Sequence, residues 1–267
     1  MNANRYNFNE VLWPDTPFPL KHHAILVGKR GSEAQGTYIP PIDPDSIDDR
    51  DIMGVCVPPV DYYLGMKRWE GADAIKGCWD VVLYDARKFI DLLTRQNPNI
   101  LCMLWLREED YIYVSPEGRT ILDNRNLFRS RTGAFNSFVG YANGQLKRMT
   151  HFGPYKGYMG AKRKALVDKY GYDTKNAAHL IRLLTMGLEY LNSQRMTVYR
   201  ESDRDELLAI KRGAWPLQRV LDRADVLFAA AREAYHNSPM IEDIDMDAVN
   251  RLTINVTKGF FERTGIS

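Results

Sequence analysis

Two aspartates with metal-binding spacing open an apolar segment of the chain. Asp49 and Asp51 stand two positions apart, and the apolar residues continue to position 57. If residues 51–57 form a β-strand, both carboxylates leave it on the same face. Two carboxylates that close repel each other unless a cation lies between them. Because carboxylate oxygens suit Mg²⁺ and Mn²⁺, the spacing predicts a divalent metal site.

A Gly-Ser pair precedes these aspartates by seventeen residues. Gly31 lets a backbone approach a ligand closely, and Ser32 supplies a hydroxyl donor. Phosphate groups need both, and Mg²⁺ is commonly bound by one or two carboxylates together with substrate phosphates. The combination predicts metal-dependent chemistry on a nucleotide. The alternative is a solvated turn in an acidic loop, because three further aspartates crowd the segment: Asp43, Asp45 and Asp48.

The chain resembles the DNA polymerase β superfamily of nucleotidyltransferases. The resemblance rests on residues 27–37, which contain the Gly-Ser pair, and on residues 49–55, which contain the two aspartates. Gln35 departs from the pattern, since related proteins often have an aromatic residue there. Four further stretches resemble the predicted nucleotidyltransferases that accompany bacterial and phage RNA-repair genes: residues 80–84, 97–99, 137–142 and 175–184.

This resemblance implies a reaction and a set of site residues. An enzyme of the EC 2.7.7 class would move a nucleoside monophosphate from an NTP such as ATP to an acceptor, with release of pyrophosphate. Asp49, Asp51 and Asp80 would bind two Mg²⁺ or Mn²⁺ ions, and Gly31 and Ser32 would orient the phosphates. The acceptor would be RNA, either tRNA or an RNA end. Two alternatives stay open: transfer to a protein or small molecule, and a non-catalytic nucleotide- or RNA-binding module.

A basic stripe follows on the predicted helix Thr174–Ser193. At about 100° per residue, Lys175, His179 and Arg182 share one face, and apolar residues cluster on the opposite face. Such a stripe is often only a solvated surface. The resemblance instead implies that these three side chains contact the triphosphate or the acceptor.

Charge and periodicity divide the chain near residue 126. Residues 1–125 contain 14 Lys/Arg and 19 Asp/Glu, whereas residues 126–267 contain 22 and 15, within a total net charge of +2. A basic second half suits a phosphate-bearing partner. We therefore expect an α/β (α+β) fold: a polymerase-β-like catalytic core with a small mixed sheet at 1–125, and a helical domain at 126–267 that completes the nucleotide and acceptor cleft.

The periodicity also predicts individual elements. In the first half we expect strands at 51–57, 78–83 and 111–114, a helix at 84–96 and a turn at 116–118. In the second half the pattern predicts helices at 134–150, 161–170, 174–193, 204–212, 215–236 and 246–264.

Several features indicate a cytoplasmic protein. No apolar run approaches the length of a membrane span, and residues 1–5 lack the apolar core of a signal peptide. The three cysteines, Cys56, Cys78 and Cys102, are odd in number and widely spaced, so we expect buried thiols in a reducing compartment. The sequence leaves the preferred NTP and the number of subunits open.

Overall fold

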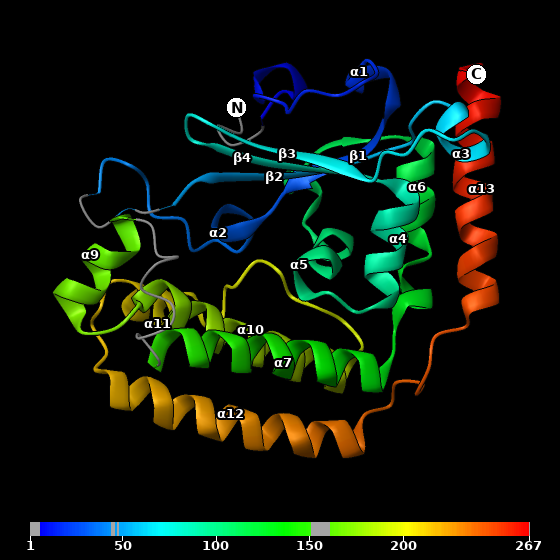
Figure 1. Ribbon diagram of the computed structural model, residues 1–267. Helices are drawn as coiled ribbons and strands as arrows, with labels where there is room; N and C mark the ends of the chain where they lie inside the picture. The colour runs from blue at the N-terminus through cyan, green and yellow to red at the C-terminus, as the bar shows by residue number, and fades with distance from the viewer. Residues whose placement is uncertain (1–5, 44–45, 47, 151–160, 267) are drawn as a thin grey trace. The chain divides into compact units, whose positions relative to one another are not determined.

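The structure contains a five-stranded mixed sheet (Figure 1). Asp51 and Asp80 lie on two of its strands, and Gly31 and Ser32 begin a short helix that follows a third. This computed structural model describes residues 6–43, 46, 48–150 and 161–266. The chain divides into two compact units. The first comprises Met1–Ala34, Asp49–Arg129 and Ile244–Ser267, and the second comprises Gln35–Asp48 and Ser130–Asp243.

The sheet of the first unit has the strand order β3-β4-β2-β1-β5. β1 runs antiparallel to both β2 and β5, β3 runs antiparallel to β4, and β2 and β4 run parallel. Its strands are β1 (Ala24–Lys29), β2 (Arg50–Cys56), β3 (Gly71–Lys76), β4 (Trp79–Asp85) and β5 (Tyr111–Val114). The β2–β4 pair matters most for the site, because it aligns Asp51 with Asp80 on the same face of the sheet.

Burial explains which segments became central strands. All six residues of β1 are buried, as expected for a strand covered on both faces. β4 alternates buried and partly exposed residues with period two, from Trp79 to Asp85. β3 is mostly exposed and lies at the sheet edge, so its sequence lacked the apolar run that would have predicted it.

Short helices and three longer ones, α4, α6 and α13, complete the described part of the first unit. Its helices are α1 (Leu20–His23), α2 (Gly31–Ala34), α3 (Asp61–Leu64), α4 (Ala86–Thr94), α5 (Pro98–Leu101), α6 (Pro116–Asp123) and α13 (Met246–Thr264), and its 3-10 turns are Phe8–Glu10, Cys102–Trp105, Glu108–Asp110 and Arg125–Phe128. The C-terminal helix α13 packs against α4 and α6 (Figure 1). Arg263 on α13 donates two hydrogen bonds, of 2.7 and 2.8 Å, to the buried Glu117 carboxylate on α6.

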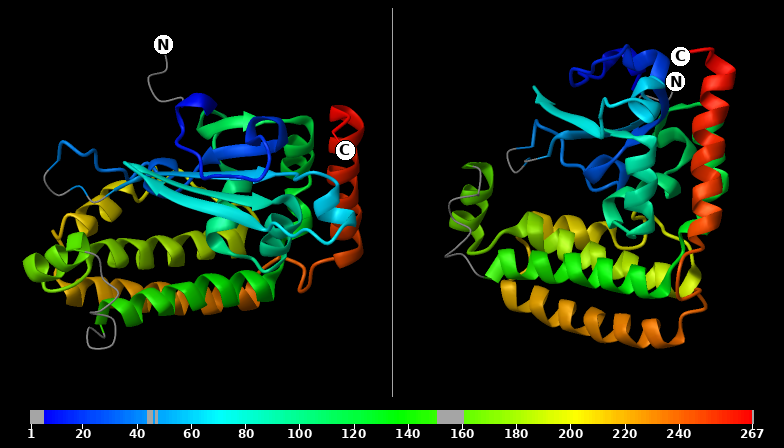
Figure 2. Two further views of the ribbon diagram at one scale, coloured as in Figure 1. Left: turned by 45° about the horizontal axis from the view of Figure 1, so that its top comes forward. Right: turned by 45° about the vertical axis from the view of Figure 1, so that its right-hand side comes forward.

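The second unit is helical. Its helices are α7 (Arg131–Thr150), α9 (Ala161–Tyr170), α10 (Thr174–Ser193), α11 (Arg204–Lys211) and α12 (Leu217–Asn237). The central helix α10 contacts the other four, and α7, α10 and α12 run alongside one another in Figure 2. Asp173 caps the start of α10 by accepting a hydrogen bond from the Asn176 backbone N–H, and Gln194 ends the helix in the left-handed conformation.

The predicted fold class is confirmed, and the helix predictions of the second half agree with the structure to within three residues at each end. Two details are wrong. Residues 116–118 begin helix α6 rather than forming an isolated turn, because Ser115 accepts a hydrogen bond from the Gly118 N–H as an N-cap. Cys78 is exposed rather than buried, since it follows Gly77 in the turn between β3 and β4, whereas Cys56 and Cys102 are buried.

The proposed domain division at 125/126 stays a prediction. The compact units of the structure are discontinuous in sequence, and the segment 244–267 belongs to the first of them. In the described part of the chain, no helix has the length and apolar character needed to cross a membrane.

Candidate active site

Two of the predicted aspartates face each other across the parallel strand pair. Asp51, the second residue of β2, is the register partner of Asp80, the second residue of β4. Register partners in a parallel pair direct their side chains to the same face of the sheet. The alignment places two carboxylates side by side at the start of both strands, although they are 29 positions apart in sequence.

The guanidinium of Arg30 bridges these two carboxylates. One terminal nitrogen, Nη2, donates a hydrogen bond of 2.6 Å to Asp80 Oδ1 and lies 3.6 Å from Asp51 Oδ1. The Arg30 backbone N–H also donates to the Asp51 carbonyl oxygen at 2.8 Å, which fixes its Cα beside β2. Arg30 Nε is shielded from solvent and has no hydrogen-bond partner among the described residues. The carboxylate pair therefore already holds a cation between its oxygens.

Gly31 is required at its position for two reasons. Its φ of +61° lies in the left-handed region, which side chains other than glycine rarely adopt. A Cβ built on Gly31 would also lie 2.0 Å from Asp51 Oδ2. The turn thus brings backbone into direct contact with a predicted metal ligand. The neighbouring Ser32 is buried, and its hydroxyl has no hydrogen-bond partner within the described residues.

The residues around this turn fit a divalent cation. Asp51 and Asp80 offer carboxylate oxygens, the ligands that Mg²⁺ and Mn²⁺ prefer, and they already accommodate positive charge from Arg30. Asp49 lies directly before β2 and is partly exposed. Over the residues that the structure describes, no three His, Cys, Asp or Glu side chains are grouped as a metal site. The roles of Asp49, Asp51 and Asp80 as a three-carboxylate set stay a prediction.

The predicted basic stripe of α10 is not a plain solvated face. Arg182 is buried, with Nη1 3.1 Å from the sulfur of Met186, and Lys175 and His179 are half-buried. Burial lowers the pKa of His179 well below its usual range, and four nearby cations lower it further: Arg182, Arg163, Lys175 and Arg148. The imidazole is therefore neutral at pH 7. Its Nε2 is shielded, with no hydrogen-bond partner in the described part of the chain.

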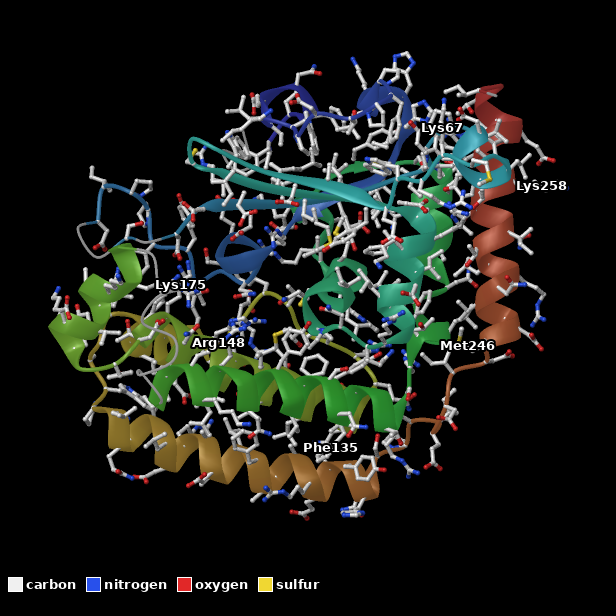
Figure 3. The ribbon with its side chains drawn as sticks, in the orientation of Figure 1. Lys67, Phe135, Arg148, Lys175, Met246 and Lys258 are labelled. Atoms are coloured by element: carbon white, nitrogen blue, oxygen red, sulfur yellow. The ribbon has the colours of Figure 1, made fainter. Side chains whose placement is uncertain are left out.

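These cations belong to three helices of the second unit. In Figure 3, Arg148 near the end of α7 and Lys175 at the start of α10 lie at the same end of the two helices. Arg163 on α9 donates a hydrogen bond of 2.8 Å to Asn176 Oδ1. These like charges repel one another, and two of them are offset by buried carboxylates, Arg163 by Asp173 and Lys175 by Asp48.

Lys175 also has a structural partner. Its Nζ lies 3.5 Å from Oδ1 of the buried Asp48, and Lys211 Nζ contacts Oδ2 of the same carboxylate. The Ile39 backbone N–H donates to Asp48 Oδ2 at 2.9 Å. Asp48 thereby ties the segment Gln35–Asp48 to helices α10 and α11 within the second unit. If Lys175 binds a phosphate, its ammonium group must contact that phosphate in addition to Asp48.

The sequence does not single out Arg30 in the first unit or two arginines in the second unit, Arg148 and Arg163. Arg30 adjoins the Gly-Ser turn, but nothing in its spacing indicates which carboxylates it meets. Arg148 and Arg163 lie in a basic stretch in which no single residue stands out. Of three aromatic residues that the sequence favours as packing residues, Phe138 and Tyr172 are buried, and the Tyr172 hydroxyl donates to the Trp215 carbonyl oxygen, whereas Tyr141 is exposed.

Comparisons with known proteins bear on the identity of the chain. No curated protein matches it. A solved structure of a nucleotidyltransferase-like protein from Exiguobacterium sibiricum 255-15 aligns over 90% of this chain and 73% of that chain, at 9% identity and a TM-score of 0.29. Residues 22–255 match the RNA repair pathway DNA polymerase beta family (RlaP), and this span contains the Gly-Ser turn, the aspartates and the basic stripe. Because that match covers most of the sequence, the chain belongs to the RNA repair pathway DNA polymerase beta family.

Proposed function

We propose that the protein is a metal-dependent nucleotidyltransferase that moves a nucleoside monophosphate from an NTP to an RNA end. The observation that carries the proposal is the register of Asp51 with Asp80, beside a Gly31 backbone that leaves no room for a Cβ. A nucleotide-binding module without catalysis would gain nothing from two carboxylates held so close together. Membership of the family supports both the reaction class and RNA as the acceptor.

In the proposed reaction the acceptor hydroxyl oxygen attacks the α-phosphorus of the NTP. The bond to the β-phosphate breaks, and pyrophosphate leaves. A divalent ion at Asp49, Asp51 and Asp80 would polarise the phosphate oxygens and lower the pKa of the acceptor hydroxyl. Asp80 accepts the proton of that hydroxyl.

The other residues bind and orient the substrates. The Ser32 hydroxyl, which lacks a hydrogen-bond partner among the described residues, donates to a phosphate oxygen, and the Gly31 backbone approaches the same group. Lys175, His179 and Arg182 contact phosphates of the triphosphate or the acceptor, where the two cations, Lys175 and Arg182, offset phosphate charge. Positioning and electrostatics carry most of the catalysis in such transfers.

To test this function, one measures whether the label of each of the four α-labelled NTPs becomes attached to an acceptor. The protein is incubated with Mg²⁺ or Mn²⁺, with and without total cellular RNA, and the labelled pool is identified. We expect label in RNA, and we expect Asp51→Asn to reduce incorporation by about a thousandfold, because it removes a charged metal ligand. Asp91→Asn, which changes an aspartate on helix α4 that pairs with Arg95, serves as the control and retains activity.

The same experiment separates the alternatives. Label in protein or in a small molecule would identify a different acceptor. Nucleotide binding without turnover under every condition would identify a non-catalytic module. Undiminished incorporation by Asp51→Asn would show that the chemistry takes place elsewhere.

A further inference from the structure

Arg30 occupies the position between Asp51 and Asp80 where a metal ion would have to bind. A single guanidinium nitrogen contacts both carboxylates, at 2.6 and 3.6 Å. Two carboxylates and one guanidinium leave a net charge of −1 at this point, whereas a divalent ion would neutralise the pair completely. Two cations cannot share the same oxygen atoms without strong repulsion. A metal ion on these two oxygens, Asp51 Oδ1 and Asp80 Oδ1, therefore requires the Arg30 side chain to leave.

The Arg30 guanidinium does not use all of its hydrogen-bond donors on the two carboxylates. A guanidinium binds a carboxylate best through two parallel N–H donors, but here Nη2 alone serves both oxygens. Nε remains shielded and has no hydrogen-bond partner in the described residues. An acceptor elsewhere would therefore satisfy donors that the present arrangement leaves unused.

The geometry also allows the exchange. The backbone of Arg30 is held to β2 through its hydrogen bond to the Asp51 carbonyl, so the side chain can move while its Cα stays in place. Side-chain exposures of 27% for Arg30, 22% for Asp51 and 33% for Asp80 leave the ion pair open to ions from solution. Arg30 directly precedes Gly31 and Ser32, where the proposed function places the phosphates.

We propose that Arg30 is an exchangeable counter-ion: it holds Asp51 and Asp80 together without metal, yields them to the metal, and then binds the triphosphate. The inference rests on the proposed function, since it assumes the metal and nucleotide sites described above. It assigns Arg30 a positioning role toward the metal ligands and a binding role toward the substrate. Metal and nucleotide would then bind cooperatively, because the metal releases the cation that the nucleotide needs.

Binding measurements without turnover test this exchange. Mn²⁺ affinity is measured by titration calorimetry in the absence of nucleotide, and affinity for α,β-methylene ATP is measured with Mn²⁺ present. Arg30→Gln should bind Mn²⁺ about tenfold more tightly, a typical coupling between sites. The same variant should bind the nucleotide about tenfold more weakly, because a charged hydrogen-bond donor is lost. Its melting temperature in EDTA should fall, since the guanidinium that lies between Asp51 and Asp80 is then absent.

Three variants make the result decisive. Arg30→Lys keeps the charge and should leave Mn²⁺ affinity within about twofold of the unsubstituted protein. If Arg30→Gln does not fold, the Mn²⁺ affinity of Arg30→Lys still tests the proposal. Arg95→Gln removes another arginine of the first unit, one that pairs with Asp91, and should change neither affinity. Asp51→Asn should abolish tight Mn²⁺ binding.

Unchanged or weaker Mn²⁺ binding by Arg30→Gln, or a marked change in Arg30→Lys, would overturn the exchange. Unchanged nucleotide affinity in Arg30→Gln would overturn its phosphate role. Failure of the proposed function looks different: Asp51→Asn would then bind Mn²⁺ as well as the unsubstituted protein.

Discussion

Gly31 shows how a single residue type makes the site feasible. A side chain at this position would meet the Asp51 carboxylate at 2.0 Å, and its backbone conformation is one that other residues rarely adopt. The two constraints act together, because the left-handed turn is what brings the backbone so close to β2. The Gly-Ser signature and the aspartate signature, which the sequence presents as separate motifs, are therefore one packed unit.

His179 predicts a pH dependence of stability. Burial and four neighbouring cations hold its pKa well below that of an exposed histidine. Above about pH 6.5 both folded and unfolded states carry the neutral imidazole, so no penalty arises. As the pH falls further, the unfolded chain takes up a proton that the folded state resists, and stability decreases by up to about 1.4 kcal/mol per pH unit.

Urea denaturation between pH 8 and pH 5, in phosphate-free buffer, checks this prediction. His179→Gln should lose less stability over the range than the unsubstituted protein. The exposed His236 provides the control, and His236→Gln should follow the unsubstituted protein. Parallel curves for all three proteins would contradict the assignment.

At the scale of elements, the parallel pairing of β2 with β4 creates the carboxylate pair, and helix α13 supports the unit that carries it. Arg263 on α13 binds Glu117 on α6 through two hydrogen bonds. Burial alone would raise the pKa of Glu117, but hydrogen bonds from Arg263 and Ser115 outweigh it and lower that pKa. The ionised Glu117 carboxylate therefore helps to attach helix α13 to helix α6.

Glu117→Gln should weaken this attachment. We expect a loss of about 1.5–3 kcal/mol at neutral pH, the usual worth of hydrogen bonds to charged groups. Because the folded-state pKa is lowered, the stabilisation is present above the unfolded value of about 4.3 and is lost as the pH falls below it. Faster amide exchange along α13 measures the effect. Glu262→Gln, which removes an exposed pair with Lys258, should change stability by less than about 1 kcal/mol.

At the scale of the whole molecule, the chain crosses from one unit to the other at positions close in sequence to the predicted site residues. The crossings at 34/35 and 48/49 fall two residues after Ser32 and immediately before Asp49. The segment Gln35–Asp48 lies between these crossings, and its residue Asp48 forms ion pairs with Lys175 and Lys211 of the second unit.

Lys175→Ala tests whether the basic residues of α10 serve the substrate. If Lys175 binds triphosphate, the KM for NTP should rise about tenfold, because a charged contact is lost, while RNA affinity is unchanged. If it binds the acceptor, RNA affinity should fall and its salt dependence should weaken. Lys164→Ala, an exposed lysine on α9, is the control. No change in either quantity would leave Lys175 with only its structural role beside Asp48.

The sequence alone was sufficient for the local features of this protein. Apolar periodicity predicted the helices and most strands, because each depends on residues a few positions apart. The Gly-Ser and Asp-x-Asp spacing predicts the chemistry of a metal and phosphate site for the same reason, and that assignment stays a prediction. The edge strand β3 and the start of α6 escaped, because an exposed strand has little apolar signal and an N-cap was mistaken for a turn.

Only the tertiary structure decided which of these residues meet. The pairing of Asp51 with Asp80 depends on the register of two strands separated by the β3 hairpin. The placement of Arg30 between them depends on a turn whose conformation no local pattern specifies. The burial of Arg182 depends on packing around α10, which helical periodicity does not reveal. Each of these contacts joins residues through the fold rather than along the chain, so spacing could indicate the chemistry but not the partners.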